Sequence, residues 1–313
     1  MASTKKVVIA ALFANGAIAI LKFGAFALTG SSSMLSEAYH SVSDTGNQVL
    51  LLLGIRMSEK GASPSHPFGR GKEQYFYAFV VAVMLFGVAG FASLTEGLDH
   101  LGSPYHGKSI LVNYAVLGGA FLFESYALLK AWKGLKREME QNDYDRIVEA
   151  YRRSKDATLL TALTEDTVAL LGIVTAMVAI GLSELYHTSF YDAVGSMVIG
   201  LLLMGFALLL AWENRGLIVG EGVTSEDRRA VLDAIRGVDA VERVVDLRTL
   251  YLGAENLLVA TEVTFRDGLA TTELEDAIDA VERAIEGEVP DASKIFVEPE
   301  DRDGRGPTVA DAG

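Results

Sequence analysis

The sequence predicts an α-helical membrane protein, with a six-transmembrane-helix domain followed by a small cytoplasmic α+β domain. Half of the 313 residues are hydrophobic, and six apolar stretches are each long enough to cross a bilayer as a helix of ~20 residues. The net charge of −14 is unevenly placed, because the chain from residue 221 onward holds 23 acidic and 10 basic residues, a net −13. The excess carboxylate therefore belongs to a water-exposed domain after the last span.

The six predicted spans form a membrane domain at residues 1–215. They cover residues 6–29, 34–57, 74–98, 109–132, 157–182 and 190–213. With the N-terminus inside, fifteen Lys and Arg residues lie at the inner ends and connections of these spans, whereas the outer connections hold only Lys108. The positive-inside rule therefore predicts a multi-pass protein of the cell membrane with both termini cytoplasmic. The first apolar run is too long for the h-region of a signal peptide, so we expect a retained helix.

Two charged features of the membrane domain need separate explanations. Lys22 is the one basic residue left within a span, and we expect its long side chain to snorkel toward the outer interface rather than to act directly in transport. The segment 134–156 carries too many charges to enter lipid. We therefore expect this segment to form a cytoplasmic helix or loop between the fourth and fifth spans.

The chain after the last span predicts a small α+β domain at residues 216–303. Two segments have the β-rich composition of strands, at 241–251 and 256–265, and a third short strand is expected at 294–298. With amphipathic helices before and after the two longer strands, the order is α-β-β-α-β, which indicates one sheet covered by one helical layer. Residues 304–313 have the composition of a disordered tail.

Both helices of this domain are expected to begin with a capping pattern. Thr224 is followed three residues later by Asp227, and Thr272 is followed three residues later by Glu275. The second helix is expected to end near Gly287. The acidic surface of the domain holds no basic stripe, which excludes nucleic acid as a partner.

Ionisable residues inside two of the predicted spans form a candidate cation site. His40 and Asp44 lie four residues apart in the second span, so a helix places them on one face with ~6 Å of rise between them. Glu165 and Asp166 lie in the fifth span. Neither span contains a Lys or Arg at membrane depth that could pair with these carboxylates. Such costly groups normally face a polar cavity or a ligand, so we expect a cation there.

The ligand types narrow the choice of cation. The chain has no cysteine, so a metal site must use imidazole, carboxylate, amide or backbone oxygen. A tetrahedral nitrogen and oxygen site suits zinc, although manganese, iron(II), cobalt and nickel can use similar ligands. We expect no resident cofactor, since the metal would be the substrate.

Four segments carry a resemblance to a known family. They are LTGSSSMLSEAYHSVSDTGNQVLLLLG, SHPFGRGKEQYFYAFVVAVMLFGVAGFASLTEGLDHL, LTEDTVALLG and YDAVGSMVIG. The sequence resembles the cation diffusion facilitators, and the PFGRGK run and the Glu165-Asp166 pair are most similar to the zinc-transporter-nine-like branch. The resemblance implies a six-helix transporter with a metallochaperone-like cytoplasmic domain, assembled as a homodimer.

The resemblance also implies a set of metal ligands. In the zinc branch, the second span provides His or Asp followed four residues later by Asp, and His40 and Asp44 match this pattern. The fifth span provides His followed four residues later by Asp. Asp166 matches the Asp, but Ala162 stands at the earlier position, so one ligand of the usual set is missing.

Two neighbouring side chains can fill the open position. Glu165 lies about 100° around the helix from Asp166, so it requires a rotation of the helix or a long reach of the side chain. Asn47, three residues after Asp44, can supply an amide oxygen. The candidate metal ligands are therefore His40, Asp44, Asp166, Glu165 and Asn47.

Other metal sites of the family are not supported. The loop run SHPFGRGK retains His66 but has Arg70 where another ligand is common. We expect Arg70 and Lys72 to contact lipid phosphate or a neighbouring carboxylate. The soluble domain has no histidine, so we expect it to support dimerisation rather than metal sensing.

The resemblance implies proton-coupled efflux of a divalent cation by alternating access, with zinc preferred and with the cation, protons and the bilayer as partners. A free imidazole titrates near pH ~6.5, so His40 can exchange a proton for a metal. An exporter of another divalent metal, an organic-cation carrier and a transport-inactive membrane interaction protein are alternatives. An enzyme is not expected, because no nucleophile–base set, nucleotide loop or HExxH signature occurs.

Overall fold

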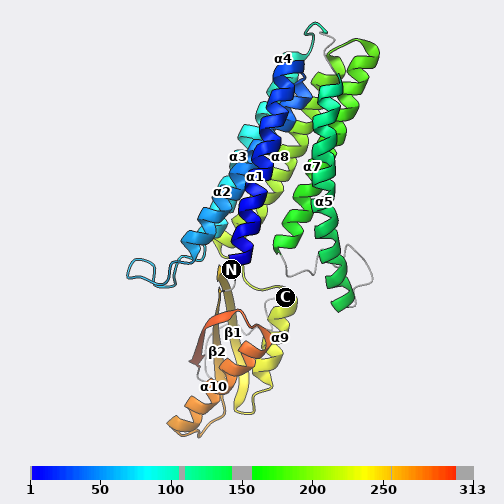
Figure 1. Ribbon diagram of the computed structural model, residues 1–313. Helices are drawn as coiled ribbons and strands as arrows, with labels where there is room; N and C mark the ends of the chain where they lie inside the picture. Colours follow the sequence, from blue (N-terminus) through cyan, green and yellow to red (C-terminus); the bar gives the residue numbers. More distant parts are fainter. Residues whose placement is uncertain (1, 106–109, 143–156, 255, 301–313) are drawn as a thin grey trace. The chain divides into compact units, whose positions relative to one another are not determined.

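The computed structural model describes most of the chain (Figure 1), namely residues 2–105, 110–142, 157–254 and 256–300. The chain divides into two compact units. The first comprises residues 1–51 and 78–212, and the second comprises residues 52–77 and 213–313. The expected disordered tail at 304–313 and most of the expected loop at 134–156 lie outside the described residues.

Long helices form the membrane domain, as the sequence predicts. Their bounds are α1 Ala2–Thr29, α2 Ser32–Ser58, α3 Glu73–Met84, η1 Leu85–Phe91, α4 Ala92–His100, α5 Ile110–Asn142, α7 Ala157–Tyr186 and α8 Phe190–Val219. The segments α3, η1 and α4 follow one another directly and correspond to the third predicted span. Within the described part of the chain, five helical stretches are long and apolar enough to cross a membrane: α1, α3 to α4, α5, α7 and α8.

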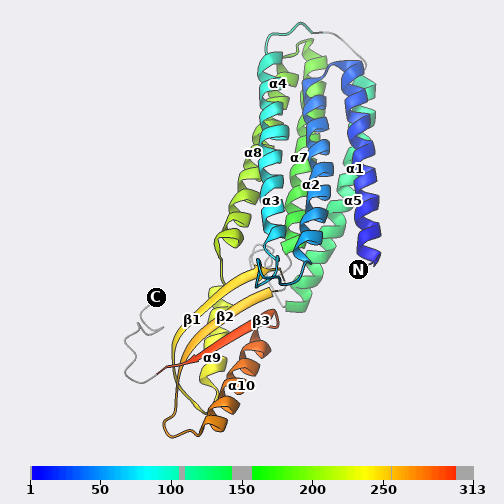
Figure 2. The same ribbon diagram turned by 90° about the vertical axis from the view of Figure 1, so that its left-hand side faces the viewer.

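The helix α2 has a similar length but is more polar than these five, and it packs among them. Its Met34 is fully buried in one apolar cluster with Leu117 of α5, Ile173 of α7 and Leu203 of α8. Figures 1 and 2 show α2 running alongside the other helices of the bundle. The polar residues of α2 therefore lie within an apolar bundle, where each of them needs a partner.

The third span contains a feature that the sequence pattern did not predict. Its middle segment, η1, is a π-helix, and Gly90 in this segment lies against α8. A Cβ atom added at Gly200 of α8 would lie only 2.7 Å from the backbone nitrogen of Leu94 and 2.8 Å from the backbone oxygen of Gly90. The two helices thus approach each other backbone to backbone, which the absence of side chains at both glycines permits.

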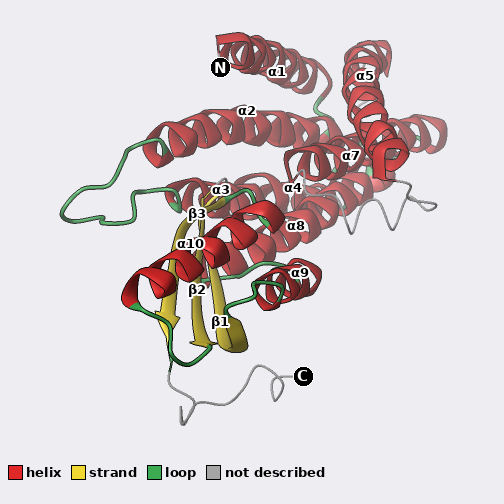
Figure 3. Cartoon of the chain, turned by 90° about the horizontal axis from the view of Figure 1, so that it is seen from below, coloured by secondary structure: helices red, strands yellow, loops and turns green. Residues whose placement is uncertain are grey.

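The soluble domain has the predicted order α-β-β-α-β. Its elements are α9 Ser225–Arg236, β1 Val241–Gly253, β2 Asn256–Phe265, α10 Thr271–Glu288 and β3 Ala292–Pro299. The strands form one sheet in the order β1-β2-β3 (Figure 2), in which β1 and β2 are antiparallel and β2 and β3 are parallel. The helix α9 lies beside β1 and α10 beside β3 (Figure 3), and the two helices contact each other.

The core of this domain lies between the helices and the sheet. Val259 of β2 and Val281 and Ile285 of α10 are fully buried there. Thr224 caps α9 as expected, since its Oγ1 accepts a hydrogen bond of 3.1 Å from the backbone N–H of Asp227. The predicted N-terminal cap of α9 is therefore confirmed.

The start of α10 differs from the predicted one. The helix begins at Thr271, and its capping carboxylate is Glu273, which accepts a 2.8 Å hydrogen bond from the backbone N–H of Ala270. The predicted start at Thr272 with Glu275 was therefore wrong. Glu273 occupies the third helical position, from which a glutamate reaches back to the residue before the helix.

We predict that Gly200→Ala lowers the thermal stability of the detergent-purified protein, whereas Gly205→Ala in the same helix does not. A Cβ at Gly200 meets backbone atoms of η1 and α4, and overpacking of this kind costs ~1–3 kcal/mol. A Cβ at Gly205 meets no atom within 4 Å and gains helix propensity. Melting curves of both variants test this prediction, and equal midpoints would contradict it.

Candidate metal centre

The candidate site begins with one pair of side chains on α2. Nδ1 of His40 lies 3.4 Å from Oδ1 of Asp44, and the two side chains are only 3% and 13% exposed. The contact agrees with the four-residue spacing, which places both side chains on one face of the helix. Neither ring nitrogen of His40 has a hydrogen-bond partner among the described residues, so the ring can still accept a ligand.

A second contact joins α2 to α7. Nδ2 of Asn47 donates a hydrogen bond of 3.2 Å to Oε1 of Glu165. Asn47 is two helical turns beyond His40 and therefore lies on the same face of α2. The hydrogen bond brings predicted residues of two spans together and shows that Glu165 faces α2. Asp166, the next residue of α7, is half-buried.

Buried polar atoms without a hydrogen bond are concentrated on α2. The described residues contain nine such side-chain atoms, and seven belong to this helix: Ser32 Oγ, Glu37 Oε1, His40 Nδ1, His40 Nε2, Ser43 Oγ, Asn47 Oδ1 and Gln48 Oε1. A buried polar atom without a partner costs ~1–3 kcal/mol. A cation or water between α2 and its neighbours would supply partners that contacts within the described chain do not.

The predicted ligands meet in pairs rather than in one complete shell. Among the described residues, no group of three His, Cys, Asp or Glu side chains lies close enough to hold one metal ion. His40 with Asp44 forms one pair, and Asn47 with Glu165 forms the other. No Lys or Arg that the structure describes forms an ion pair with Asp44, Glu165 or Asp166.

Lys22 and Glu37 form a buried ion pair that the sequence did not lead us to predict. Nζ of Lys22 lies 2.8 Å from Oε2 of Glu37 and donates a second bond of 2.8 Å to Oγ of Ser41. Lys22 is 1% exposed and Glu37 is fully buried, so the expected snorkelling of Lys22 was wrong. The side chain of Lys22 on α1 thus reaches α2, which offers a carboxylate. Glu37 lies three residues before His40, and this spacing is the signal that could have placed Glu37 on the same face of α2.

A cavity of about 330 Å³ lies at the end of the bundle where α1 ends and α2 begins. Polar side chains from several helices line it, among them Ser32, His100, Asn113, Glu184 and Asp192. Both carboxylates have partners, and Glu184 accepts a hydrogen bond from the hydroxyl of Tyr105. This bond to a carboxylate raises the pKa of the Tyr105 hydroxyl above its ordinary value.

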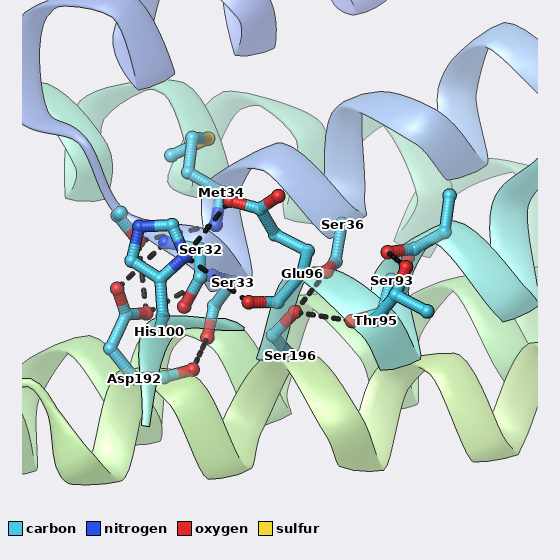
Figure 4. A network of polar contacts seen from close by, with 12 residues as sticks. Ser32, Ser33, Met34, Ser36, Ser93, Thr95, Glu96, His100, Asp192 and Ser196 are labelled. Carbon is cyan, nitrogen blue, oxygen red and sulfur yellow. Dashed lines mark hydrogen bonds and ion pairs between the residues drawn. The ribbon is translucent and has the colours of Figure 1, made fainter. Parts of the chain in front are cut away.

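Asp192 of α8 anchors the first turn of α2 beside this cavity (Figure 4). Its carboxylate accepts hydrogen bonds from the backbone N–H groups of Ser32 and Ser33, at 2.8 and 3.1 Å, and from Oγ of Ser31, at 2.9 Å. A carboxylate at the N-terminus of a helix satisfies donors that have no partner within the helix. The position of α2 along the bundle is therefore fixed from α8.

The loop between α2 and α3 confirms the expected carboxylate contact for Arg70, whereas Lys72 contacts a backbone oxygen instead. Nη1 of Arg70 lies 4.0 Å from Oε1 of Glu73, a neighbouring carboxylate. Nζ of Lys72 donates a hydrogen bond of 3.3 Å to the backbone oxygen of Ile218. Both cations therefore have partners within the second unit.

Comparison with known proteins identifies two family domains in the chain. Residues 8–219 match the cation efflux transmembrane domain, and residues 223–302 match the cytoplasmic domain of cation efflux proteins. Together these matches span both the helical and the α+β parts described above.

Three named relatives show the extent of the similarity. The chain is 33% identical over 270 residues to the proton-coupled zinc antiporter SLC30A9, mitochondrial, of Homo sapiens. The aligned region covers 85% of this chain and 47% of that protein. The chain is 28% identical over 262 residues to metal tolerance protein C4 of Arabidopsis thaliana, covering 84% and 57%. It is 25% identical over 292 residues to the cation-efflux pump FieF of Escherichia coli O1:K1, covering 92% and 90%.

The chain thus spans about half the length of the human relative and most of the length of the bacterial one. Both family domains are those of cation efflux proteins, and two of the three relatives are named as an antiporter and an efflux pump, in agreement with the expectation that the chain is not an enzyme. The helical membrane domain, the α+β domain and these matches show that the chain belongs to the cation efflux family, also called the cation diffusion facilitators.

Proposed function

We propose that this protein exports divalent metal cations from the cytoplasm in exchange for protons, with zinc as the preferred ion. The observation that supports this most directly is the concentration of unpartnered buried polar atoms on α2, the helix that contacts Glu165 of α7. Such groups are costly inside an apolar bundle unless they serve a ligand. The names of the zinc antiporter and of the cation-efflux pump among the relatives agree with a cation as that ligand.

The proposed ligands combine one imidazole with several oxygen donors. They are His40, Asp44, Asp166, Glu165 and Asn47. The hydrogen bond between Asn47 and Glu165 supports a role for both, since it places them at the contact of α2 with α7. In this proposal Glu165 takes the place of the ligand that is missing at Ala162. One nitrogen and several oxygens are a donor set that suits zinc.

Proton coupling follows from the chemistry of these ligands. Metal binding requires a neutral imidazole and ionised carboxylates, so metal uptake releases protons and protonation releases the metal. The His40–Asp44 pair and the Asn47–Glu165 pair belong to two different contacts, one within α2 and one between α2 and α7. We propose that movement of α2 relative to α7 closes the ligand shell and opens it to alternate sides of the membrane.

We further propose a cellular location and an oligomeric state for this protein. The distribution of Lys and Arg supports a multi-pass protein of the cell membrane with cytoplasmic termini. Residues 1–215 then form the transport domain. Residues 216–303, which lack histidine, form a dimerisation domain, a role that fits the cytoplasmic-domain match.

We predict that Asp44→Ala and Asp166→Ala each abolish zinc-dependent proton flux in proteoliposomes, because each removes a charged ligand. Asp233→Ala, which removes an exposed aspartate of α9, serves as the matched control and should leave flux unchanged. A pH-sensitive dye inside the vesicles measures the flux, and size-exclusion profiles check folding. Undiminished flux in both membrane variants would refute the site assignment.

We predict that His40→Asp changes the order in which divalent metals compete for the site. Replacing the only nitrogen ligand by oxygen weakens the preference for zinc relative to manganese. Competition binding of zinc, manganese, cobalt and nickel to the purified wild type and variant measures the order. An unchanged order would mean that His40 does not set selectivity.

We predict that Glu165→Gln weakens zinc binding by about tenfold or more, and that Ala162→His restores it in the Glu165→Gln background. Position 162 precedes Asp166 by four residues, so a histidine there shares its helical face. Calorimetric titration of zinc into the three proteins measures the affinities. Wild-type affinity in Glu165→Gln alone would contradict the proposed substitution of ligands.

A further inference from the structure

The ion pair between Lys22 and Glu37 lies in the interior of the membrane domain, beside the proposed metal site. The distance between Nζ and Oε2 is 2.8 Å, and both side chains are almost completely shielded from solvent. Two charges at such a depth are rare in membrane helices because removing them from water is expensive. A pair of this kind is expected either to hold two helices together or to take part in function.

The position of Glu37 along α2 favours a functional role of the ion pair over a purely structural one. Glu37 precedes His40 by three residues and Asp44 by seven, so all three share one face of the helix, with ~5 Å and ~10 Å of rise from Glu37. Ser32, five residues before Glu37, lines the 330 Å³ cavity at the end of the bundle. Along the axis of α2, Glu37 therefore lies between the proposed metal site and this cavity.

One oxygen of Glu37 remains available for a further partner. Oε2 pairs with Lys22, but Oε1 has no hydrogen-bond partner among the described residues although the side chain is fully buried. Oε1 points toward Gly172 of α7, where an added Cβ would lie only 2.5 Å away. The glycine thus leaves room for the carboxylate at the contact between α2 and α7.

We propose that Glu37 is a further ligand of the transported divalent cation, which it binds as the cation moves from His40 and Asp44 toward the cavity, and that Lys22 holds Glu37 when no cation is there. This inference rests on the proposed transport function. In the exchange, the cation replaces Lys22 as the partner of the carboxylate. Lys22 retains its 2.8 Å hydrogen bond to Ser41.

The positive charge of Lys22 also explains how the cation can leave Glu37 again. A cation bound to Glu37 lies next to a second positive charge in a medium of low dielectric constant, so the two repel each other strongly. Conduction requires sites that bind well enough to be entered and weakly enough to be left. Lys22 therefore limits the occupancy of Glu37 and returns to it when the cation has gone.

A purely structural ion pair makes a different prediction, and a double-mutant cycle separates the two. The variants are Lys22→Met, Glu37→Gln and the double variant, in which both partners are neutral. Ser36→Ala is the matched control, because it removes the 2.6 Å hydrogen bond between Ser36 and Ser196 in the same turn of α2 without removing a charge. Zinc uptake into proteoliposomes gives kcat and KM, and calorimetry on the same proteins gives zinc affinity.

If Glu37 is a ligand, Glu37→Gln lowers kcat about tenfold or more. The KM changes less, because His40 and Asp44 still bind the cation. Lys22→Met frees the carboxylate, so zinc binds more tightly and kcat falls. The double variant stays as slow as Glu37→Gln, and Ser36→Ala transports like the wild type. These four results together support the proposal.

For a structural pair, the double variant recovers wild-type transport, because no charge is left buried without a partner. That recovery would overturn the proposal, even if a single variant fails to fold. Wild-type kinetics in Glu37→Gln would overturn it as well. A wild-type protein that moves no divalent cation would instead overturn the proposed function, and this inference with it.

Discussion

The arrangement of the membrane domain depends on the cost of placing one polar helix face inside an apolar bundle. In α2, Glu37, His40, Asp44 and Asn47 follow one another at helical spacing, and each is at least partly buried. The lipid around the bundle offers these groups no hydrogen bonds, so neighbouring helices or a bound ligand must supply them. Lys22 of α1 and Glu165 of α7 supply contacts to two of them. The neighbours of α2 are therefore set by its polar atoms as well as by apolar packing.

The same constraint explains several small residues and caps around α2. Gly172 leaves space for the carboxylate of Glu37, and Gly195 of α8 leaves space beside Ser33, whose Oγ would lie 2.7 Å from an added Cβ. Asp192 accepts three hydrogen bonds from the start of α2. These contacts hold the start of α2 against α8. Precise placement matters for the proposed metal site, because its ligands lie on two helices and must reach one cation.

The sequence was sufficient to predict features that depend on local spacing. The long membrane helices follow from the lengths of the apolar runs, although α2 is more polar than the other five. The α-β-β-α-β order follows from composition and periodicity, and the contact between His40 and Asp44 follows from a four-residue spacing. Features that depend on which helices are neighbours were missed. Lys22 was assigned to the interface because nothing in α1 alone indicates that Glu37 faces it. The π-helical segment around Gly90 likewise reflects close contact with α8 rather than local propensity.

The missing ligand at Ala162 and the unpartnered oxygen of Glu37 are both explained by the need to release a transported cation. A transporter must release its cation in every cycle, so a complete and rigid shell of strong ligands would be a disadvantage. In the proposed transport cycle, ligands spread along α2, with Glu37 nearest the cavity and Asp44 farthest from it, offer the cation successive partial shells rather than one tight shell. In this proposal Lys22 keeps the charge of Glu37 compensated while no cation is bound there, because an unpaired buried carboxylate would be more costly than the ion pair.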